Sequence, residues 1–378
     1  PRFSTLPVMT SAEMIDYERE MVDKGYITRP VSSAWGAGYA ISTAAKLLLD
    51  AKDGVISQDV ANAELEKLAS RSAYRDVKKY LLQSSFSQQY NLSFSGASEQ
   101  MSYFLSASYA NERSNTKGNN GDRFTLTSNL NFKLMNWATL TTGIRASLLN
   151  IKDNGLGLSS MQASLGILPL MPYDQLVDDN GNRVDYYRYD EVFVKEREAL
   201  GYQSWRYNYL DELDNKDNMR KEQAVALTMG LNIPVPGVKG LALDGSFMYE
   251  KTNNKVRNYE NENTYAARDR YNYATRYDES TGTLTHGLPG GALLNVAHTD
   301  ARNYSLRGQL NYDNTIAEIH QVSALAGIEF RETRTWQNGA YYYGYNEQTL
   351  LAASQIQNPY TNIWGWNSYL LDGSPETD

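Results

Sequence analysis

The feature that most constrains the fold of this chain is an alternation of apolar and polar residues with a period of two. Apolar side chains such as Tyr90, Leu92 and Phe94 alternate with polar neighbours such as Asn91 and Ser93. The pattern recurs in eight segments, which cover residues 90–95, 101–109, 123–134, 138–148, 225–233, 241–250, 304–312 and 321–330. Successive side chains of a strand point to opposite faces, so the pattern predicts eight strands with one apolar and one polar face.

The connections between these segments alternate between short and long. The short ones are 96–100, 135–137, 234–240 and 313–318, and the long ones are 111–122, 152–222, 251–302 and the chain after residue 335. Structureless loops of more than about 15 residues are uncommon in compact soluble domains. Outer-membrane barrels have short periplasmic turns and long external loops. The sequence therefore predicts an all-β fold, an antiparallel segment of a transmembrane β-barrel with short helices in its extracellular loops.

Aromatic residues near the strand ends agree with this prediction. Membrane-spanning barrels carry aromatic girdles at both interfaces with water. The aromatic residues at these positions are Tyr90, Tyr109, Phe124, Trp137, Tyr249, Tyr304, Tyr312 and Phe330. A soluble antiparallel β-sandwich has the same alternation within its strands, so a surface binding or adhesion protein on such a sandwich is the alternative.

Composition excludes several classes of function. The chain has no cysteine, which excludes disulfides, thiolate metal sites and cysteine nucleophiles. Its net charge is −8 and its basic residues are scattered, whereas a nucleic-acid-binding protein needs a concentrated basic face. Tyrosine is frequent, at 29 residues, which disfavours a disordered chain. No apolar run reaches the roughly 18 residues of a membrane-spanning helix.

The first 84 residues have a helical pattern instead. Thr10 and Glu13 have the spacing of a capping box, and Gly25 is a suitable end for the helix that follows. Two more helices are expected over residues 44–50 and 57–68. Because this region has few apolar residues, we interpret residues 1–84 as a helical extracellular loop region. Residues 85–335 then hold the strands, and residues 336–378 begin a further external loop.

Two aromatic clusters in the long loops are the candidate substrate-binding residues. Aromatic rings with a polar edge can stack on sugar rings or hold peptides. The candidates are Tyr202, Trp205, Tyr207 and Tyr209 in one loop, and Tyr341, Tyr343, Trp364 and Trp366 in the last one. The alternative is that these rings pack the loops against one another or against a partner.

No catalytic, metal or cofactor site is predicted. His286, His298 and His320 do not form a metal-binding motif, and the sequence has no phosphate-binding glycine loop and no nucleophile elbow. Residues 178–182 have some of the oxygen density of a calcium loop but lack its spaced acids. The many acidic residues of the long loop are best interpreted as a solvated surface, although a pair of them is the arrangement that glycosidases use.

Residues 85–152 resemble the SusC/RagA-type TonB-dependent transporters. Residues 85–99 are similar to the family's "HNLSFSGGSE" segment, residues 103–109 to its "YYLSLGY" strand, and residues 122–131 to its "RYSLRLNLD" strand. Residues 137–140 resemble the start of the next strand, and residues 9–18 resemble the segment after the first barrel strand. The order and spacing agree over about 150 residues.

The resemblance implies strands two to nine of a barrel with twenty-two strands, in which a plug fills the lumen. The plug, the TonB box and the closing strand of the family are not recognised here, so the chain is expected to be a piece of a longer protein. The implied function is TonB-dependent import of a glycan or peptide across the bacterial outer membrane. The implied partners are a SusD-like surface lipoprotein, the TonB–ExbB–ExbD complex and outer-membrane lipid.

Polar residues of the strands should then face the lumen, because the other face must satisfy lipid. The charged residues predicted to face it are Arg123, Lys133, Arg145, Asp244, Glu250, Arg307 and Glu329.

Overall fold

The structure, a computed structural model, describes residues 9–31, 38–135, 137–156, 170–317 and 319–353. Its main element is one antiparallel sheet of eight strands in the order β1-β2-β3-β4-β7-β8-β11-β12. The strands are β1 (Phe86–Ala97), β2 (Met101–Arg113), β3 (Asn119–Met135), β4 (Ala138–Asp153), β7 (Lys216–Pro234), β8 (Leu241–Glu260), β11 (Ala292–Ile316) and β12 (His320–Tyr345). The prediction of eight consecutive antiparallel strands is therefore confirmed.

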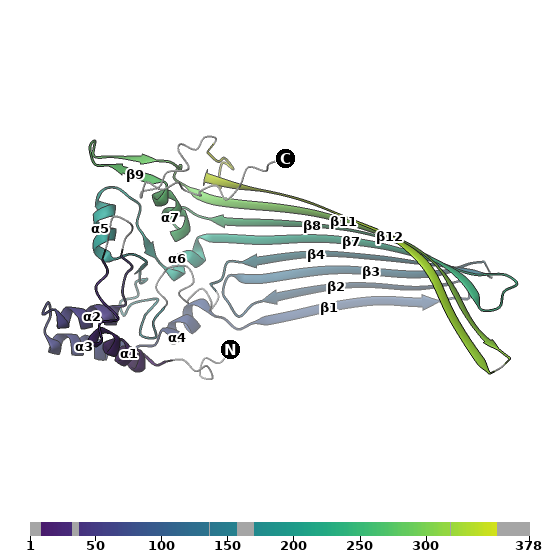
Figure 1. Cartoon of the computed structure of the whole chain (residues 1–378), viewed down its shortest axis with the longest axis horizontal. Helices are drawn as coiled ribbons and strands as arrows, with labels where there is room; N and C mark the ends of the chain where they lie inside the picture. Colours follow the sequence, from purple (N-terminus) through teal and green to yellow (C-terminus); the bar gives the residue numbers. More distant parts are fainter. Residues whose placement is uncertain (1–8, 32–37, 136, 157–169, 318, 354–378) are drawn as a thin grey trace.

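The long strands run side by side, with all the helices at one end of the sheet and the short turns at the other (Figure 1). No helix of the described residues has both the length and the apolar character that crossing a membrane requires. The short turns at the other end follow the predicted positions. At one of them Gly240 has φ +86°, and a Cβ there would lie 2.2 Å from the Asp313 carbonyl oxygen, so only glycine fits this contact between the β7–β8 turn and β11.

The last four strands of the sheet are longer than the sequence pattern predicts. Strand β7 already begins at Lys216, inside the predicted loop 152–222. Residues 251–260 and 292–302 were expected in a loop, but they continue β8 and β11 and pair in register, with Lys251 opposite Arg302. In the same way β12 runs on to Tyr345. These extensions lack the regular alternation that marks a strand, because residues 251–260 are mostly polar, whereas residues 292–294 are apolar on both faces and buried. Their backbone hydrogen bonds hold the ladder regardless of side-chain type.

Three helices form a small cluster at the loop end of the sheet. They are α1 (Ser11–Asp23), α2 (Thr43–Lys52) and α3 (Gln58–Ala69), and the expected capping box of Thr10 and Glu13 is present. Their core contains Ile15, Val22, Ala44, Ala45, Leu48, Leu49, Leu65 and Leu68. The buried ring of Tyr173, from the distant β4–β7 connection, completes this core. Helix α4 (Ala73–Asp76) and a π-helical turn, Val77–Leu81, lead from the cluster to β1.

The two long connections are folded rather than irregular. The β4–β7 connection holds β5 (Tyr186–Tyr187), α5 (Glu191–Ala199), β6 (Arg206–Tyr207) and α6 (Tyr209–Asp214). The β8–β11 connection holds α7 (Tyr265–Tyr273), β9 (Thr275–Asp278) and β10 (Thr283–His286). We call the described residues 9–31, 38–85, 170–215 and 261–291 the loop cap. Its second core gathers side chains of the π-helical turn and of both connections around Trp205.

Candidate functional site

The seven predicted lumen residues all lie on one face of the sheet. Partners across an antiparallel ladder share a face, as do residues separated by an even number along a strand. Arg307 pairs directly with Glu329, and Arg145 is linked to Glu250 through Ala226. Lys133 is opposite Thr139, Thr139 is opposite Asn232, and Asn232 is opposite Asp244, so Lys133 and Asp244 share a face. Arg123 lies on the same face as Lys133, because the two are separated by an even number of residues along β3.

Polar side chains interact along this face. Asn232 Nδ2 donates to Asp244 Oδ1 at 2.6 Å, and Ser305 Oγ donates to Glu329 Oε1 at 2.9 Å. Arg331 also pairs with Glu329, at 2.8 Å. The face therefore offers hydrogen-bonding groups and charges of both signs, which is a surface suited to water or to a polar protein domain. Whether it lines a lumen stays a prediction, because the described strands do not close a barrel.

The opposite face is apolar and uncovered. Ile328 is 79% exposed and Phe330 is 65% exposed, and Leu92, Phe94 and Leu306 of other strands are exposed as well. The only other sheets among the described residues have two strands each, and they belong to the loop cap. A β-sandwich buries such side chains between two stacked sheets. The described residues thus contain a single-layer sheet, which does not match the sandwich alternative.

The first aromatic cluster is buried inside the loop cap. Trp205 is only 2% exposed, and Tyr202, Tyr207 and Tyr209 are buried beside it. Tyr202 stacks on Trp205 with 5.7 Å between ring centroids, and Tyr207 meets Tyr209 edge to face at 4.9 Å. None of these four rings is exposed in the structure. The packing matches the alternative in which they hold the loops together, and their contact with a substrate stays a prediction.

Helix α7 fixes the buried cluster in place. The Trp205 indole N–H donates to Asp269 Oδ1 at 3.0 Å, and burial raises the pKa of Asp269. The Arg268 guanidinium donates to the carbonyl oxygens of Ser204 and Arg206, both at 2.6 Å. Polar groups buried in this way are costly to leave unpaired, so these contacts determine one arrangement of the two loops.

The second aromatic cluster divides in the structure. Tyr341 lies on the polar face near the loop-cap end of β12 and is 43% exposed, while Tyr343 is buried. The two rings lie 4.9 Å apart between centroids. Tyr341 is thus the one candidate of the described residues whose ring is accessible on the polar face. Trp364 and Trp366 lie outside the described residues.

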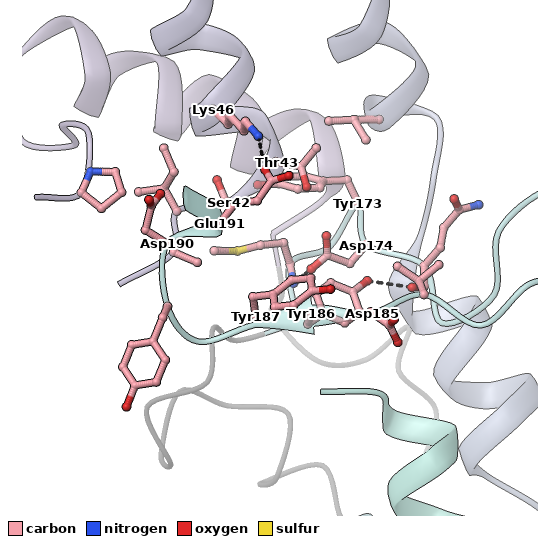
Figure 2. Close-up of a pocket in the computed structure, with 18 of the residues that line it drawn as sticks. Ser42, Thr43, Lys46, Tyr173, Asp174, Asp185, Tyr186, Tyr187, Asp190 and Glu191 are labelled. Carbon is pink, nitrogen blue, oxygen red and sulfur yellow. Dashed lines mark hydrogen bonds and ion pairs between the residues drawn. The ribbon is translucent and has the colours of Figure 1, made fainter. Parts of the chain in front are cut away.

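A cavity of about 590 Å³ lies between the three-helix cluster and the β4–β7 connection (Figure 2). Segments that are far apart in the sequence line it, including Ser42 and Lys46 of the helical region and Tyr186, Tyr187 and Glu191 of the connection. Its volume falls in the range of sites that bind small molecules or peptide side chains.

A buried carboxyl group, Glu18, and a half-buried one, Asp174, form the polar interior next to the cavity. Ser42 Oγ and Tyr173 Oη donate to the two oxygens of Glu18, at 2.5 Å and 2.6 Å, and burial raises the pKa of Glu18. Asp174 lines the cavity and accepts from the Met171 backbone N–H at 2.7 Å. Burial raises the pKa of Asp174 to about 7. This carboxyl group is therefore largely uncharged in mildly acidic solution.

The cavity rim is charged. Lys46 of α2 pairs with Glu191 of α5 at 2.6 Å, which joins the helical cluster to the β4–β7 connection. Hydrogen bonds from Lys195 and then from Lys46 lower the pKa of Glu191 to about 2. Aromatic walls, hydrogen-bonding groups and both charge signs suit a polar ligand with charged groups rather than a purely apolar one.

The sequence alone does not reveal this cavity. Its walls come from segments around residues 42–46, 171–175 and 184–191, and no motif marks any of them. The only available signal was the capping pattern of the first helices.

The other candidate residues have structural partners. Asp178 accepts hydrogen bonds from the backbone N–H groups of Asn180 and Asn182, at 2.9 Å and 2.7 Å, so its carboxylate closes a tight turn. His286 stacks on Tyr271 with 4.8 Å between ring centroids, and His298 lies 2.6 Å from the Asn253 amide. The described residues contain no group of three or more His, Asp or Glu side chains arranged for a metal ion.

Comparison with known proteins finds the same architecture. No family model and no curated protein matches the sequence. A chain of the structure titled "RagAB peptide importer in the 'closed-closed' state" matches with a TM-score of 0.59 and 18% identity over 92% of this chain and 35% of that chain. The RagAB peptide transporter matches with a TM-score of 0.57, 19% identity and coverages of 92% and 35%. The "open-open" state of the RagAB peptide importer matches with a TM-score of 0.56 and 18% identity, over 92% of this chain and 34% of that chain.

These matches concern the fold. The chain has the architecture of one part of a larger β-barrel importer chain and spans about a third of the length of the chains it matches. The resemblance to RagA-type transporters that the sequence indicates is thereby confirmed at the level of the fold.

Proposed function

We propose that this chain forms part of the wall of a SusC/RagA-type, TonB-dependent importer in the bacterial outer membrane. The observation that carries the proposal is the two-faced, single-layer sheet, whose apolar side chains are exposed and whose charged side chains lie on the opposite face. A large apolar surface is stable only against lipid or another apolar surface. The likeness of the fold to importer chains supports lipid as the partner of this face.

The dimensions of the apolar face support a membrane location. Tyr304 and Tyr312 lie on this face of β11 and are about 27 Å apart along the strand, at roughly 3.4 Å per residue. With a strand tilt of roughly 40°, this separation corresponds to about 21 Å of depth, close to the roughly 25 Å apolar band of outer-membrane barrels. The aromatic residues would then lie at the two interfaces, as girdle residues do.

The polar face would line the lumen or contact a plug. Arg123, Lys133, Arg145, Asp244, Glu250, Arg307 and Glu329 would provide its charges. In this proposal the protein transports and does not catalyse. Energy would come from TonB–ExbB–ExbD through parts of the protein outside this chain.

The imported nutrient would be a peptide or a glycan too large for ordinary porins, and a SusD-like lipoprotein would cover the loop cap from outside. The matched structures are titled as a peptide importer and a peptide transporter, which favours a peptide over a glycan as the imported nutrient. Tyr341 is the accessible aromatic residue on the polar face, and the cavity beside Asp174 offers aromatic and charged groups. Both are the proposed contact points for substrate.

Growth of a deletion strain tests the proposal. Loss of the gene should abolish growth on one oligopeptide mixture or one complex glycan, and leave growth on free amino acids and monosaccharides unchanged. Complementation with the wild-type gene should restore growth. Normal growth of the deletion strain on every substrate, or a purified protein that is monomeric and folded without detergent, would refute the proposal.

A further inference from the structure

Five basic side chains gather on the apolar-face side of the sheet, just beyond the apolar band. This outer cationic patch comprises Lys221, Lys251, Lys255, Arg302 and Arg334. The residues lie on β7, β8, β11 and β12, between the Tyr249–Tyr304 pair and the loop-cap ends of the strands. They belong to the strand extensions that the sequence pattern did not predict.

The register brings these cations directly opposite one another. Lys251 pairs with Arg302, and Arg302 pairs in turn with Arg334, so three cations form one row across three strands. A second row places Lys221 opposite Lys255. Like charges directly opposite in a sheet destabilise it, so a native protein is expected to compensate them.

Compensation within the protein is incomplete. Asp300 lies 3.5 Å from Lys251 and 3.2 Å from Arg302, and Glu332 pairs with Arg334. Lys221 and Lys255 are exposed and have no ion-pair partner among the described residues. Within the described part of the chain, Asp300 and Glu332 are thus the two carboxylates that pair with the five cations, and neither pairs with Lys221 or Lys255 of the second row.

On the polar face of these strands, basic and acidic groups are mixed. Glu222 lies next to Lys221 on that face and pairs with Arg220 at 2.7 Å, and Glu250 lies next to Lys251. The opposed lysines Lys221 and Lys255, for which the residues that the structure describes supply no ion-pair partner, lie on the outward side. The arrangement points to a negatively charged partner on that side.

Aromatic residues place the patch at the interface of the membrane. Tyr249 and Tyr304 pair across β8 and β11 and stack with 6.1 Å between ring centroids, one step along the same face from Lys251 and Arg302. On the other side of Arg334 the exposed ring of Trp336 follows. Tyrosine, tryptophan and long cationic side chains occur together where a bilayer meets water.

We propose that the outer cationic patch binds the phosphate groups of anionic lipid headgroups in the outer leaflet. This inference rests on the membrane location in the proposed function. Guanidinium and ammonium groups are the protein's strongest donors to phosphate oxygens, and basic side chains at a bilayer surface attract anionic lipids. A bound phosphate would neutralise the opposed lysines that no carboxylate reaches.

The test uses the complete protein in nanodiscs of phosphatidylcholine that contain a small fraction of bisphosphorylated lipid A. Native mass spectrometry of the released protein counts the lipid A molecules retained. The patch variant carries Lys221→Ser, Lys255→Ser and Arg302→Ser, and the matched control carries Lys24→Ser, Lys67→Ser and Lys239→Ser at exposed sites elsewhere. Wild type and control should retain lipid A equally, and the patch variant about tenfold less.

Two further arms identify the ligand. Lipid A without its phosphates should not be retained above the phosphatidylcholine background, and millimolar inorganic phosphate should not displace the intact lipid. Equal retention by wild type and patch variant, or equal retention of the dephosphorylated lipid, would overturn the inference while leaving the membrane location intact. Displacement by inorganic phosphate would replace a headgroup site by a site for free phosphate. A protein that does not enter nanodiscs would refute the proposed function as well.

A single substitution gives an independent readout. Lys255→Ser removes one member of an opposed, uncompensated pair, so in lipid-free detergent it should raise resistance to unfolding relative to wild type. In lipid A nanodiscs this advantage should disappear, because wild type then has its counterion. An advantage of the same size in both media would contradict the inference.

Discussion

Replacing Ile328 by arginine tests the face assignment on which the proposed function depends. Ile328 pairs with Gly308, which lies midway between Tyr304 and Tyr312 on the apolar face of β11. Its side chain is 79% exposed, so in a membrane it would contact lipid over most of its surface. Gly308 is four residues from Tyr304 and four from Tyr312. This separation corresponds to about 10 Å of depth between Ile328 and either interface at a strand tilt of roughly 40°.

The expected cost follows from this depth. An arginine side chain reaches about 6–7 Å, so it cannot bring its charge to either interface without deforming the bilayer. Arginine at the middle of a barrel's lipid face costs about 2–4 kcal/mol. Ile328→Arg should therefore lower the folded-to-unfolded ratio by about 30-fold or more, since about 1.4 kcal/mol corresponds to a factor of ten.

The measurement is a guanidinium titration of the complete protein folded into lipid vesicles, followed by its heat-modifiable migration on a gel. The matched control is Gln309→Arg, at the same depth on the polar face and opposite Asp244. It should cost less than about 1 kcal/mol, because the new charge faces a carboxylate and not lipid. If Gln309→Arg destabilises the protein more than Ile328→Arg does, the two faces are assigned the wrong way round and the reasoning fails.

Three predictions concern the loop cap. Tyr173→Phe removes a donor to the buried Glu18 carboxyl and should cost about 1–3 kcal/mol of local stability, seen as faster hydrogen exchange in residues 10–70. Trp205→Phe should have a similar effect on the β4–β7 connection, because it leaves Asp269 without its indole donor; unchanged exchange there would contradict this. Asp174 has a pKa raised by burial to about 7, so the native state keeps a proton that the unfolded chain releases above its ordinary pKa of 3.8. Stability of the cap should fall as pH rises from about 4 to 7, by at most about 1.4 kcal/mol per unit, and Asp174→Asn should remove this slope in exchange measurements.

The strands inside the apolar band could be predicted from the sequence because, in the proposed membrane location, lipid on one face and water on the other select the side chains. Leu306 and Phe330 alternate with Arg307 and Glu329 for this reason. Beyond the band the strands meet water or, at the start of β11, side chains of the loop cap, so the regular alternation ends. The extension of β8 to Glu260 was missed because hydrogen bonding to β7 and β11 is independent of side-chain polarity.

The interior of the loop cap was harder to predict. Tyrosine and tryptophan suit an exposed binding surface and a buried core with polar partners equally well. Whether these rings are buried in a core depends on contacts with residues that are distant in the sequence. Arg268 and Asp269 of α7 meet the segment around Trp205 from more than 60 residues away, and no period in the sequence records that meeting.

The loop cap is also tied to the strand ends, which restricts how the proposed importer could open. Glu212 of α6 is buried, accepts from the Tyr265 backbone N–H at 2.5 Å and pairs with Lys216 of β7 at 3.1 Å. Lys216 also pairs with Glu260 of β8, at 3.6 Å. Removing one partner of a buried ion pair costs several kcal/mol, so these loops would not detach from the wall by thermal fluctuation. Entry of substrate would then depend on movement of a separate part, such as the proposed lipoprotein lid, with the cap acting as its fixed seat.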